Sequence, residues 1–198
     1  MDGRVLEEAL VGSDASKLKP EQKMIEARAF VKSLDEPRKI LEREGAIHRG
    51  DYEIHDVIFR SVDQNIPLSQ EFLRIRSNKK NIWNEKNFVV AVKQTELKEI
   101  GKNSIIPVRE EFDTEEETKK YLEQHMLDKY MYDFEFNRTG SQYELGEDGV
   151  DLENIEGNSS IEVKSKTEDG IRKLLKLLGI TEVIKGPTVV AVKELLKK

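Results

Sequence analysis

The chain has 198 residues, a length that fits one domain or one domain with a short tail. Charged residues make up 36% of it and the net charge is −6, which argues against nucleic acid as a partner, because polyanion binding normally rests on a basic surface. The sequence has no cysteine and no apolar run of about 18 residues, so disulfide scaffolds, thiol nucleophiles, cysteine-ligated zinc and a membrane span are excluded.

The N-terminal segment differs in character from the rest of the chain. Residues 1–22 are predicted to form an N-terminal extension, and residues 23–198 a single folded domain. The chain begins Met-Asp-Gly-Arg with no apolar segment behind it. We therefore expect no secretory signal and a cytoplasmic location.

Short strands rich in β-branched and aromatic residues recur along the predicted domain. They are expected over residues 24–32, 52–61, 71–77, 87–95, 105–113, 130–136, 141–145 and 159–166. Asn137 to Gly140 is predicted to be a hairpin turn between the sixth and seventh of these strands. The acidic segment 146–157 is predicted to be a loop with room for one short strand.

Helices are expected singly between the strands. Asp35 is predicted to cap the first helix, which Gly45 ends. Thr114 and Glu117 form a predicted capping box for the second, and a third begins after Thr167. The last dozen residues are expected to add a helix or a strand. Many short strands with single helices between them favour an antiparallel α+β barrel or sandwich over a doubly wound sheet.

Charged and apolar residues alternate on five of the predicted strands, so each of these strands has one charged face. Arg74 and Arg76, for example, alternate with Leu73 and Ile75. The other four strands carry Glu26 and Arg28; Lys93; Arg109, Glu111 and Asp113; and Glu162, Lys164 and Lys166. In most antiparallel sheets such a face meets solvent. In a closed barrel whose apolar faces pack outward against helices, the charged faces line the interior, which is physically reasonable where the interior holds a highly charged ligand and water.

The order of these motifs resembles the CYTH superfamily, which includes class IV adenylate cyclases, thiamine triphosphatases and inorganic triphosphatases. The resemblance rests on Met24-Ile-Glu26-Ala-Arg28, Leu73-Arg74-Ile-Arg76, Val90-Ala-Val-Lys93, Arg109-Glu-Glu111 and Ile161-Glu162-Val-Lys164, over residues 23–198. It implies an α+β fold with a closed antiparallel eight-stranded β-barrel, helices packed outside, and a triphosphate bound inside.

The resemblance also implies which residues carry the function. The basic residues expected to bind the triphosphate are Arg28, Arg74, Arg76, Lys93 and Arg109. The acidic residues expected to hold Mg²⁺ or Mn²⁺ are Glu26, Glu111, Asp113 and Glu162. Guanidinium groups make bidentate contacts to phosphate, and carboxylate oxygens are the ligands that hard cations prefer.

The sequence departs from the family pattern at three places. Met24 and Lys164 stand where the family has the first and the last of its glutamates. An ammonium group beside a metal site repels the ion. We therefore expect Lys164 to contribute to triphosphate binding by replacing part of the charge of a metal. The basic pair that the family carries before its late hairpin is also missing, because Asp133 and Glu135 occupy that strand and Arg138 falls in the predicted turn.

The leading functional expectation is a metal-assisted hydrolase of a small-molecule triphosphate or nucleotide. One alternative is a class IV-type adenylate cyclase, which would convert ATP to cyclic AMP and pyrophosphate. Another is a non-catalytic module that binds polyphosphate or a nucleotide, which the altered carboxylates favour. A structural domain with solvated charged strand faces is the remaining alternative. A homodimer is a candidate assembly for any of them.

Overall fold

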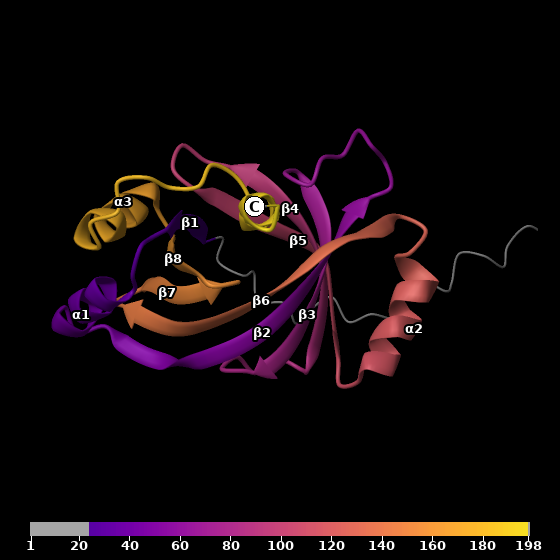
Figure 1. Ribbon diagram of the computed structural model, residues 1–198, viewed down its shortest axis with the longest axis horizontal. Helices are drawn as coiled ribbons and strands as arrows, with labels where there is room; N and C mark the ends of the chain where they lie inside the picture. Colours follow the sequence, from indigo (N-terminus) through magenta and orange to yellow (C-terminus); the bar gives the residue numbers. More distant parts are fainter. Residues whose placement is uncertain (1–23, 198) are drawn as a thin grey trace, which may run out of the picture.

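Within residues 24–197, which the computed structural model describes, eight antiparallel strands close into a barrel and four helices pack outside it (Figure 1). The strands are β1 (Ile25–Phe30), β2 (Ile47–Ser61), β3 (Glu71–Lys80), β4 (Phe88–Leu97), β5 (Lys102–Phe112), β6 (Tyr130–Leu145), β7 (Asp148–Ile155) and β8 (Asn158–Ser165). The helices are α1 (Asp35–Arg43), α2 (Glu115–His125), α3 (Glu168–Leu177) and α4 (Thr188–Leu195). The strand order around the barrel is β1-β5-β4-β3-β2-β6-β7-β8, which confirms the predicted closed α+β barrel.

Local signals fix the starts of the helices. At α2 the Thr114 hydroxyl accepts a hydrogen bond from the backbone N–H of Glu117, and the Glu117 carboxylate accepts one from the backbone N–H of Thr114, so the predicted capping box is confirmed. Thr167 caps α3 in a similar way. The predicted cap of α1 is wrong by one position, because Leu34 holds the cap position and Asp35 is the first helical residue.

The apolar cores lie between the barrel wall and the helices. Ile171 and Leu174 of α3 pack in a cluster with Ile25 of β1 and Val163 of β8, and α1 covers the same end of the barrel. The helix α2 packs on β3 and β4, and α4 packs on β2 and β6. On β3, Leu73 packs under α2, so Arg74 and Arg76 on the other face point into the barrel. The cluster at α4 differs, because its Phe72 and Phe136 line the barrel interior together with Val189 of α4.

The strand β6 is longer than predicted, and the predicted turn from Asn137 to Gly140 is wrong. These residues pair with β2 on one side, and Arg138 to Gly140 also pair with β7 on the other, so they continue the strand. The acidic segment after Gly146 is also mostly strand, namely β7. A glycine in this place suggests a turn in the sequence, but Gly140 makes room for the ring of Tyr52 on β2. A Cβ atom on Gly140 would lie 2.5 Å from both Cζ and Oη of Tyr52.

This contact predicts the effect of adding one methyl group to β6. The Gly140→Ala substitution should lower the free energy of unfolding by about 1–3 kcal/mol, because the buried Tyr52 ring has to move. The Gly149→Ala substitution in β7 is a matched control, since its Cβ would come no closer than 3.5 Å to Lys164. Urea denaturation of the two variants measures the difference. Equal stabilities would contradict the proposed role of Gly140.

Two further sequence predictions concern the N-terminal extension and membrane-spanning segments. The N-terminal extension predicted over residues 1–22 lies outside the described residues. Among residues 24–197, none of the helices is long and apolar enough to cross a bilayer.

Candidate functional site

The barrel encloses a cavity of about 580 Å³, within the size range of small-molecule sites. Each of the eight strands contributes at least one charged side chain to its wall. The charged residues that line it are Glu26 and Arg28 (β1), Asp56 (β2), Arg74 and Arg76 (β3), Lys93 (β4), Lys102 and Arg109 (β5), Arg138 (β6), Asp151 and Glu153 (β7), Glu162 and Lys164 (β8), and Glu85 from the β3–β4 loop.

The charge of the cavity is opposite to that of the whole chain. Among the described residues, eight lysines and arginines and six aspartates and glutamates line the wall, which gives a formal charge of +2. The chain as a whole carries −6. An excess of positive charge inside an acidic protein indicates a site for an anion, since buried charges that lack partners are costly.

Asp56 is the centre of a cluster of three arginines. Its Oδ1 lies 3.0 Å from Nε of Arg76 and 3.7 Å from Nε of Arg74, and its Oδ2 lies 3.1 Å from Nη2 of Arg138. Asp56 itself is 1% exposed. Burial opposes ionisation here, but the attraction of Arg76, Arg138 and Arg74 outweighs it and lowers the pKa of the Asp56 carboxyl.

Positive charge near Asp56 is only partly neutralised. Burial and the neighbouring Arg76 guanidinium lower the pKa of Arg74 to about 9. Burial and the nearby Arg74 lower the pKa of Lys93 well below its ordinary value. Among residues 24–197, no carboxylate lies close enough to the Lys93 ammonium group to form an ion pair with it. We call this part of the cavity the cationic end, made of Arg74, Arg76, Lys93, Arg109, Arg138, Asp56 and Glu85.

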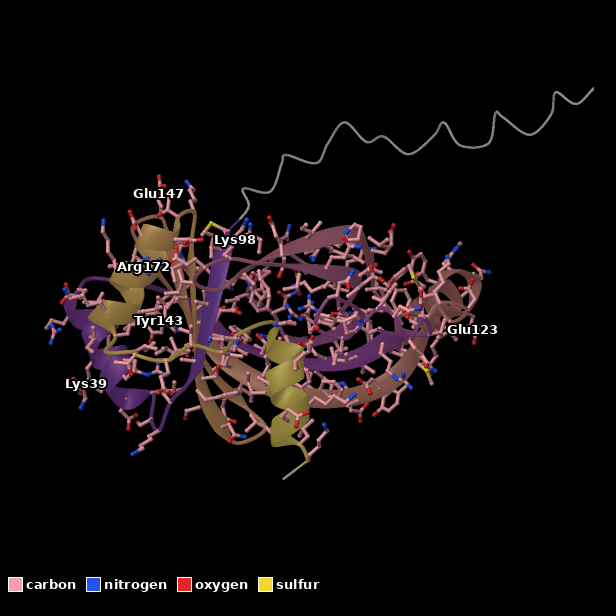
Figure 2. The ribbon with its side chains drawn as sticks, turned by 90° about the horizontal axis from the view of Figure 1, so that it is seen from above. Lys39, Lys98, Glu123, Tyr143, Glu147 and Arg172 are labelled. Atoms are coloured by element: carbon pink, nitrogen blue, oxygen red, sulfur yellow. The ribbon has the colours of Figure 1, made fainter. Side chains whose placement is uncertain are left out.

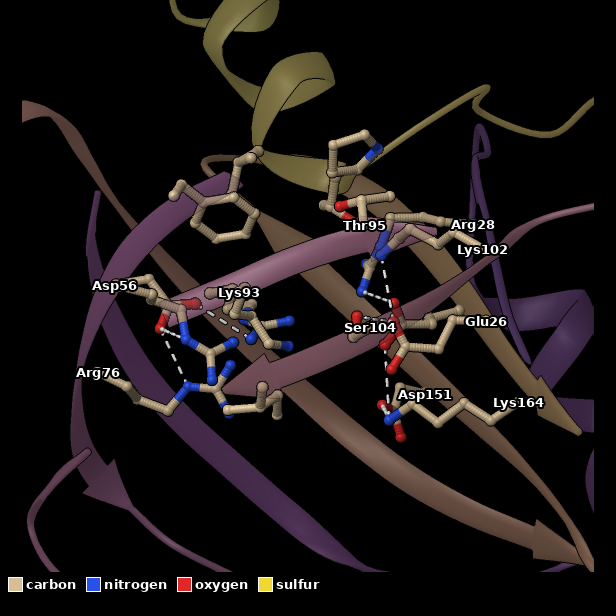
Figure 3. Close-up of a pocket in the computed structure, with 18 of the residues that line it drawn as sticks. Glu26, Arg28, Asp56, Arg76, Lys93, Thr95, Lys102, Ser104, Asp151 and Lys164 are labelled. Atoms are coloured by element: carbon tan, nitrogen blue, oxygen red, sulfur yellow. Dashed lines mark hydrogen bonds and ion pairs between the residues drawn. The ribbon is translucent and has the colours of Figure 1, made fainter. Parts of the chain in front are cut away.

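The opposite side of the cavity, which we call the carboxylate end, holds four acidic residues and three basic ones (Figure 3). They are Glu26, Asp151, Glu153 and Glu162, with Arg28, Lys102 and Lys164. The Lys102 Nζ lies 3.2 Å from Oε2 of Glu26. The Lys164 Nζ lies 2.6 Å from Oδ2 of Asp151 and 3.5 Å from Oε2 of Glu162.

Glu153 joins the two ends. Its carboxylate accepts hydrogen bonds from Arg28 and Tyr52, and its Oε1 lies 2.9 Å from Nη1 of Arg138, which also contacts Asp56. Burial opposes ionisation of Glu153, but Arg28 and Arg138 lower its pKa. This network fixes the positions of both arginines.

Several buried polar atoms of the cavity have hydrogen-bonding capacity left. The Nε atoms of Arg28, Arg74 and Arg138, and Oδ1 of Asp151, have no hydrogen-bond partner among the described residues. Unsatisfied buried donors are uncommon in folded proteins. Three of these four atoms are guanidinium donors, so the capacity that remains is suited to an anionic ligand.

The structure brings eight of the ten predicted site residues into the cavity. These are Glu26, Arg28, Arg74, Arg76, Lys93, Arg109, Glu162 and Lys164. Glu111 and Asp113 do not line it. Glu111 pairs with Arg109 at 3.0 Å, and Asp113 points outward, where its side chain is 62% exposed and pairs with Lys86.

Sequence reasoning missed Tyr52, Asp56, Lys102, Arg138, Asp151 and Glu153. For the pair on β7 a signal was present, because Asp151 and Glu153 are two residues apart and therefore share a face of a strand. The loop predicted over residues 146–157 hides this signal. The turn predicted from Asn137 to Gly140 leaves Arg138 out of the site, and its position inside β6 corrects that prediction.

Trp83 is one of the aromatic residues that line the cavity, and it lies beside the arginines. The ring of Trp83, from the β3–β4 loop, lies 4.8 Å from the ring of Tyr52, and the Arg76 guanidinium lies 5.9 Å from its centroid. Trp83 is the single tryptophan of the sequence. Its fluorescence therefore reports on this cavity alone.

The acidic residues present do not fit a divalent metal ion. Within residues 24–197, no three side chains of the His, Cys, Asp and Glu types are grouped so that they could hold one. The two predicted ligands inside the cavity, Glu26 and Glu162, are each paired with a basic side chain. The Mg²⁺ or Mn²⁺ site therefore stays a sequence expectation, and no chemical step is derived through it.

Comparison with known proteins finds solved structures with a similar fold. No protein-family model matches the chain, and no curated protein is similar enough in sequence to match. A protein of Pyrococcus horikoshii is similar in structure with a TM-score of 0.68 and 17% identity, covering 88% of this chain and 99% of its own. A candidate adenylate cyclase of Vibrio parahaemolyticus gives a TM-score of 0.62 and 12% identity, with coverages of 89% and 99%.

A third structure is a candidate adenylyl cyclase of Hippeastrum, described as having a dominant triphosphatase activity. It matches with a TM-score of 0.58 and 16% identity, covering 86% of this chain and 94% of its own. The chain shares the fold of these proteins. The likeness concerns the fold, a closed barrel of eight strands.

Proposed function

We propose that the cavity binds the polyphosphate part of a triphosphate-containing compound. The observation that carries this proposal is the cationic end, which has five basic residues and two carboxylates of its own, Asp56 and Glu85. Glu153 and Glu111 add one contact each, to Arg138 and Arg109. Positive neighbours contribute to the low pKa of both Arg74 and Lys93. An anion bound there offsets the repulsion between these positive groups, so the cationic end favours anion binding.

A polyphosphate suits this end better than a single carboxylate. The guanidinium groups of Arg74, Arg76, Arg109 and Arg138 come from three strands, so they can contact several phosphate groups in a chain. Each guanidinium can make two parallel hydrogen bonds to phosphate oxygens. Ion pairs with Asp56 and Glu153 hold Arg74, Arg76 and Arg138 in place before the ligand arrives.

Hydrolysis of the bound triphosphate is the second part of the proposal. The Hippeastrum protein with the same fold is described as a triphosphatase, and the arginines of the cationic end would stabilise negative charge on a phosphoryl group in transfer. A panel of inorganic tripolyphosphate, ATP and thiamine triphosphate, with Mg²⁺, Mn²⁺ or chelator, tests this. Orthophosphate release marks hydrolysis, and pyrophosphate with cyclic AMP marks cyclisation. Binding without any turnover marks a binding module and contradicts hydrolysis.

Arg74→Ala should weaken tripolyphosphate binding by about tenfold to a hundredfold, because a charge-assisted phosphate contact is lost. Arg172→Ala is the matched control. Arg172 lies on α3 at the outside of the molecule and pairs with the exposed Glu99, so its loss should leave binding unchanged (Figure 2). Titration calorimetry measures both. An equal effect of the two substitutions, or no binding by the unmodified protein, would contradict the proposal.

A further inference from the structure

We propose that polyphosphate binds in this cavity without a divalent cation, because Lys102 and Lys164 already neutralise the carboxylates that would otherwise hold one. The inference rests on the proposed function and deepens it. The inference is that protein side chains alone neutralise the phosphate chain.

Lysine ammonium groups contact three of the four acidic side chains at the carboxylate end. Lys102 contacts Glu26 at 3.2 Å, and Lys164 contacts Asp151 at 2.6 Å and Glu162 at 3.5 Å. The fourth, Glu153, is 1% exposed and bonded to arginines. Each of these three carboxylates therefore has one oxygen paired with a lysine, and a divalent ion that used those oxygens would have to displace it. Oδ1 of Asp151 has no hydrogen-bond partner among the described residues.

Strand register explains why Lys164 stands among the carboxylates. Lys164 and Glu162 are two residues apart on β8, so both point into the barrel. Lys164 pairs in register with Glu26 of β1, and Glu162 pairs with Asp151 of β7. The ammonium group is therefore placed among acidic side chains from β1, β7 and β8, where its charge offsets theirs.

The charges of the two ends support the same conclusion. The carboxylate end has four acidic and three basic side chains, a formal charge of −1 that is nearly balanced. The cationic end has five basic and two acidic side chains, a formal charge of +3. The unbalanced positive charge is thus provided by fixed side chains, and a polyanion can be neutralised there without a metal.

The test is a titration of the full chain with inorganic tripolyphosphate in excess EDTA and again in excess Mg²⁺. Trp83 fluorescence and calorimetry follow the binding. We expect saturable binding in EDTA, with an affinity at least equal to that in Mg²⁺, because Mg²⁺ competes for the free ligand. Binding that appears only with Mg²⁺ overturns this inference and leaves the proposed function standing. Binding under neither condition overturns the proposed function itself.

A charge-reversal variant sharpens the test. Lys164→Glu places a third carboxylate beside Glu162 and Asp151, and should weaken binding in EDTA by at least about tenfold, with partial recovery on addition of Mg²⁺. Lys166→Glu is the matched control just after the end of β8, since Lys166 does not line the cavity and pairs with the exposed Glu147 (Figure 2). Lys164→Gln serves if the reversal prevents folding, and should weaken binding in EDTA in the same direction. Unchanged binding by a folded Lys164 variant overturns the role of Lys164.

Discussion

Replacing Asp56 with alanine is expected to lower the free energy of unfolding by about 3–5 kcal/mol, because it leaves three buried arginines without their shared counter-ion. Asp56 is the single acidic residue that contacts Arg74, Arg76 and Arg138 together within the described part of the chain. Urea denaturation monitored by Trp83 fluorescence measures the loss.

The same variant connects stability with ligand binding. Tripolyphosphate should restore more stability to the Asp56→Ala protein than to the unmodified one, because the anion replaces the missing carboxylate. Asp113→Ala is the control, since the pair that Asp113 makes with Lys86 is exposed and its loss should not be measurable. An Asp56→Ala protein as stable as the Asp113→Ala protein would show that the arginine cluster does not depend on Asp56.

Acid is expected to unfold the barrel by protonating its buried carboxylates. The pKa values of Asp56, Glu153 and Glu162 are all lowered in the folded state from ordinary values of 3.8 for aspartate and 4.5 for glutamate, because ion pairs with arginine or lysine overcome the effect of burial. A group with a lowered folded pKa stabilises the protein above its unfolded pKa, and this contribution is lost as the pH falls toward the folded pKa.

The free energy of unfolding should therefore decrease by about 3 kcal/mol or more between about pH 5 and about pH 2. Asp151 acts in the opposite direction, since burial raises its pKa, but it is one group against four, because the pKa of Glu26 is lowered as well. Denaturant titrations over this pH range give the profile. The Asp56→Asn variant should show a shallower decrease. A flat profile for the unmodified protein would contradict the ionised state of these carboxylates.

The alternation of charged and apolar residues predicts the two faces of five strands, whereas the closed eight-stranded barrel is implied by the family resemblance. Arg74 and Arg76 beside Leu73 and Ile75 already define two faces of a strand, and repeating this pattern on five strands favours a charged interior. The helix starts at Thr114 and Thr167 follow from local hydrogen bonds, so they too could be read from the sequence.

Other features depend on contacts between distant parts of the chain. Gly140 has the local signature of a turn, and only the ring of Tyr52, which is 88 positions earlier, explains its place in a strand. Arg138 likewise lies in the site only because its segment pairs with β2 and β7 and continues β6. A period of two identifies the face of a strand but gives no partner on the next strand. Asp56 contacts arginines of both β3 and β6, and Lys164 lies among carboxylates. Neither could be predicted without the register of the sheet.

A crystal structure of the protein grown with inorganic tripolyphosphate in EDTA tests the central claim most directly. We expect a phosphate chain inside the barrel, in contact with Arg74, Lys93 and Arg109, while Lys164 still contacts Asp151. Phosphate density only on the outer surface, with the arginines of the cationic end still paired with Asp56 and Glu85, would contradict the account.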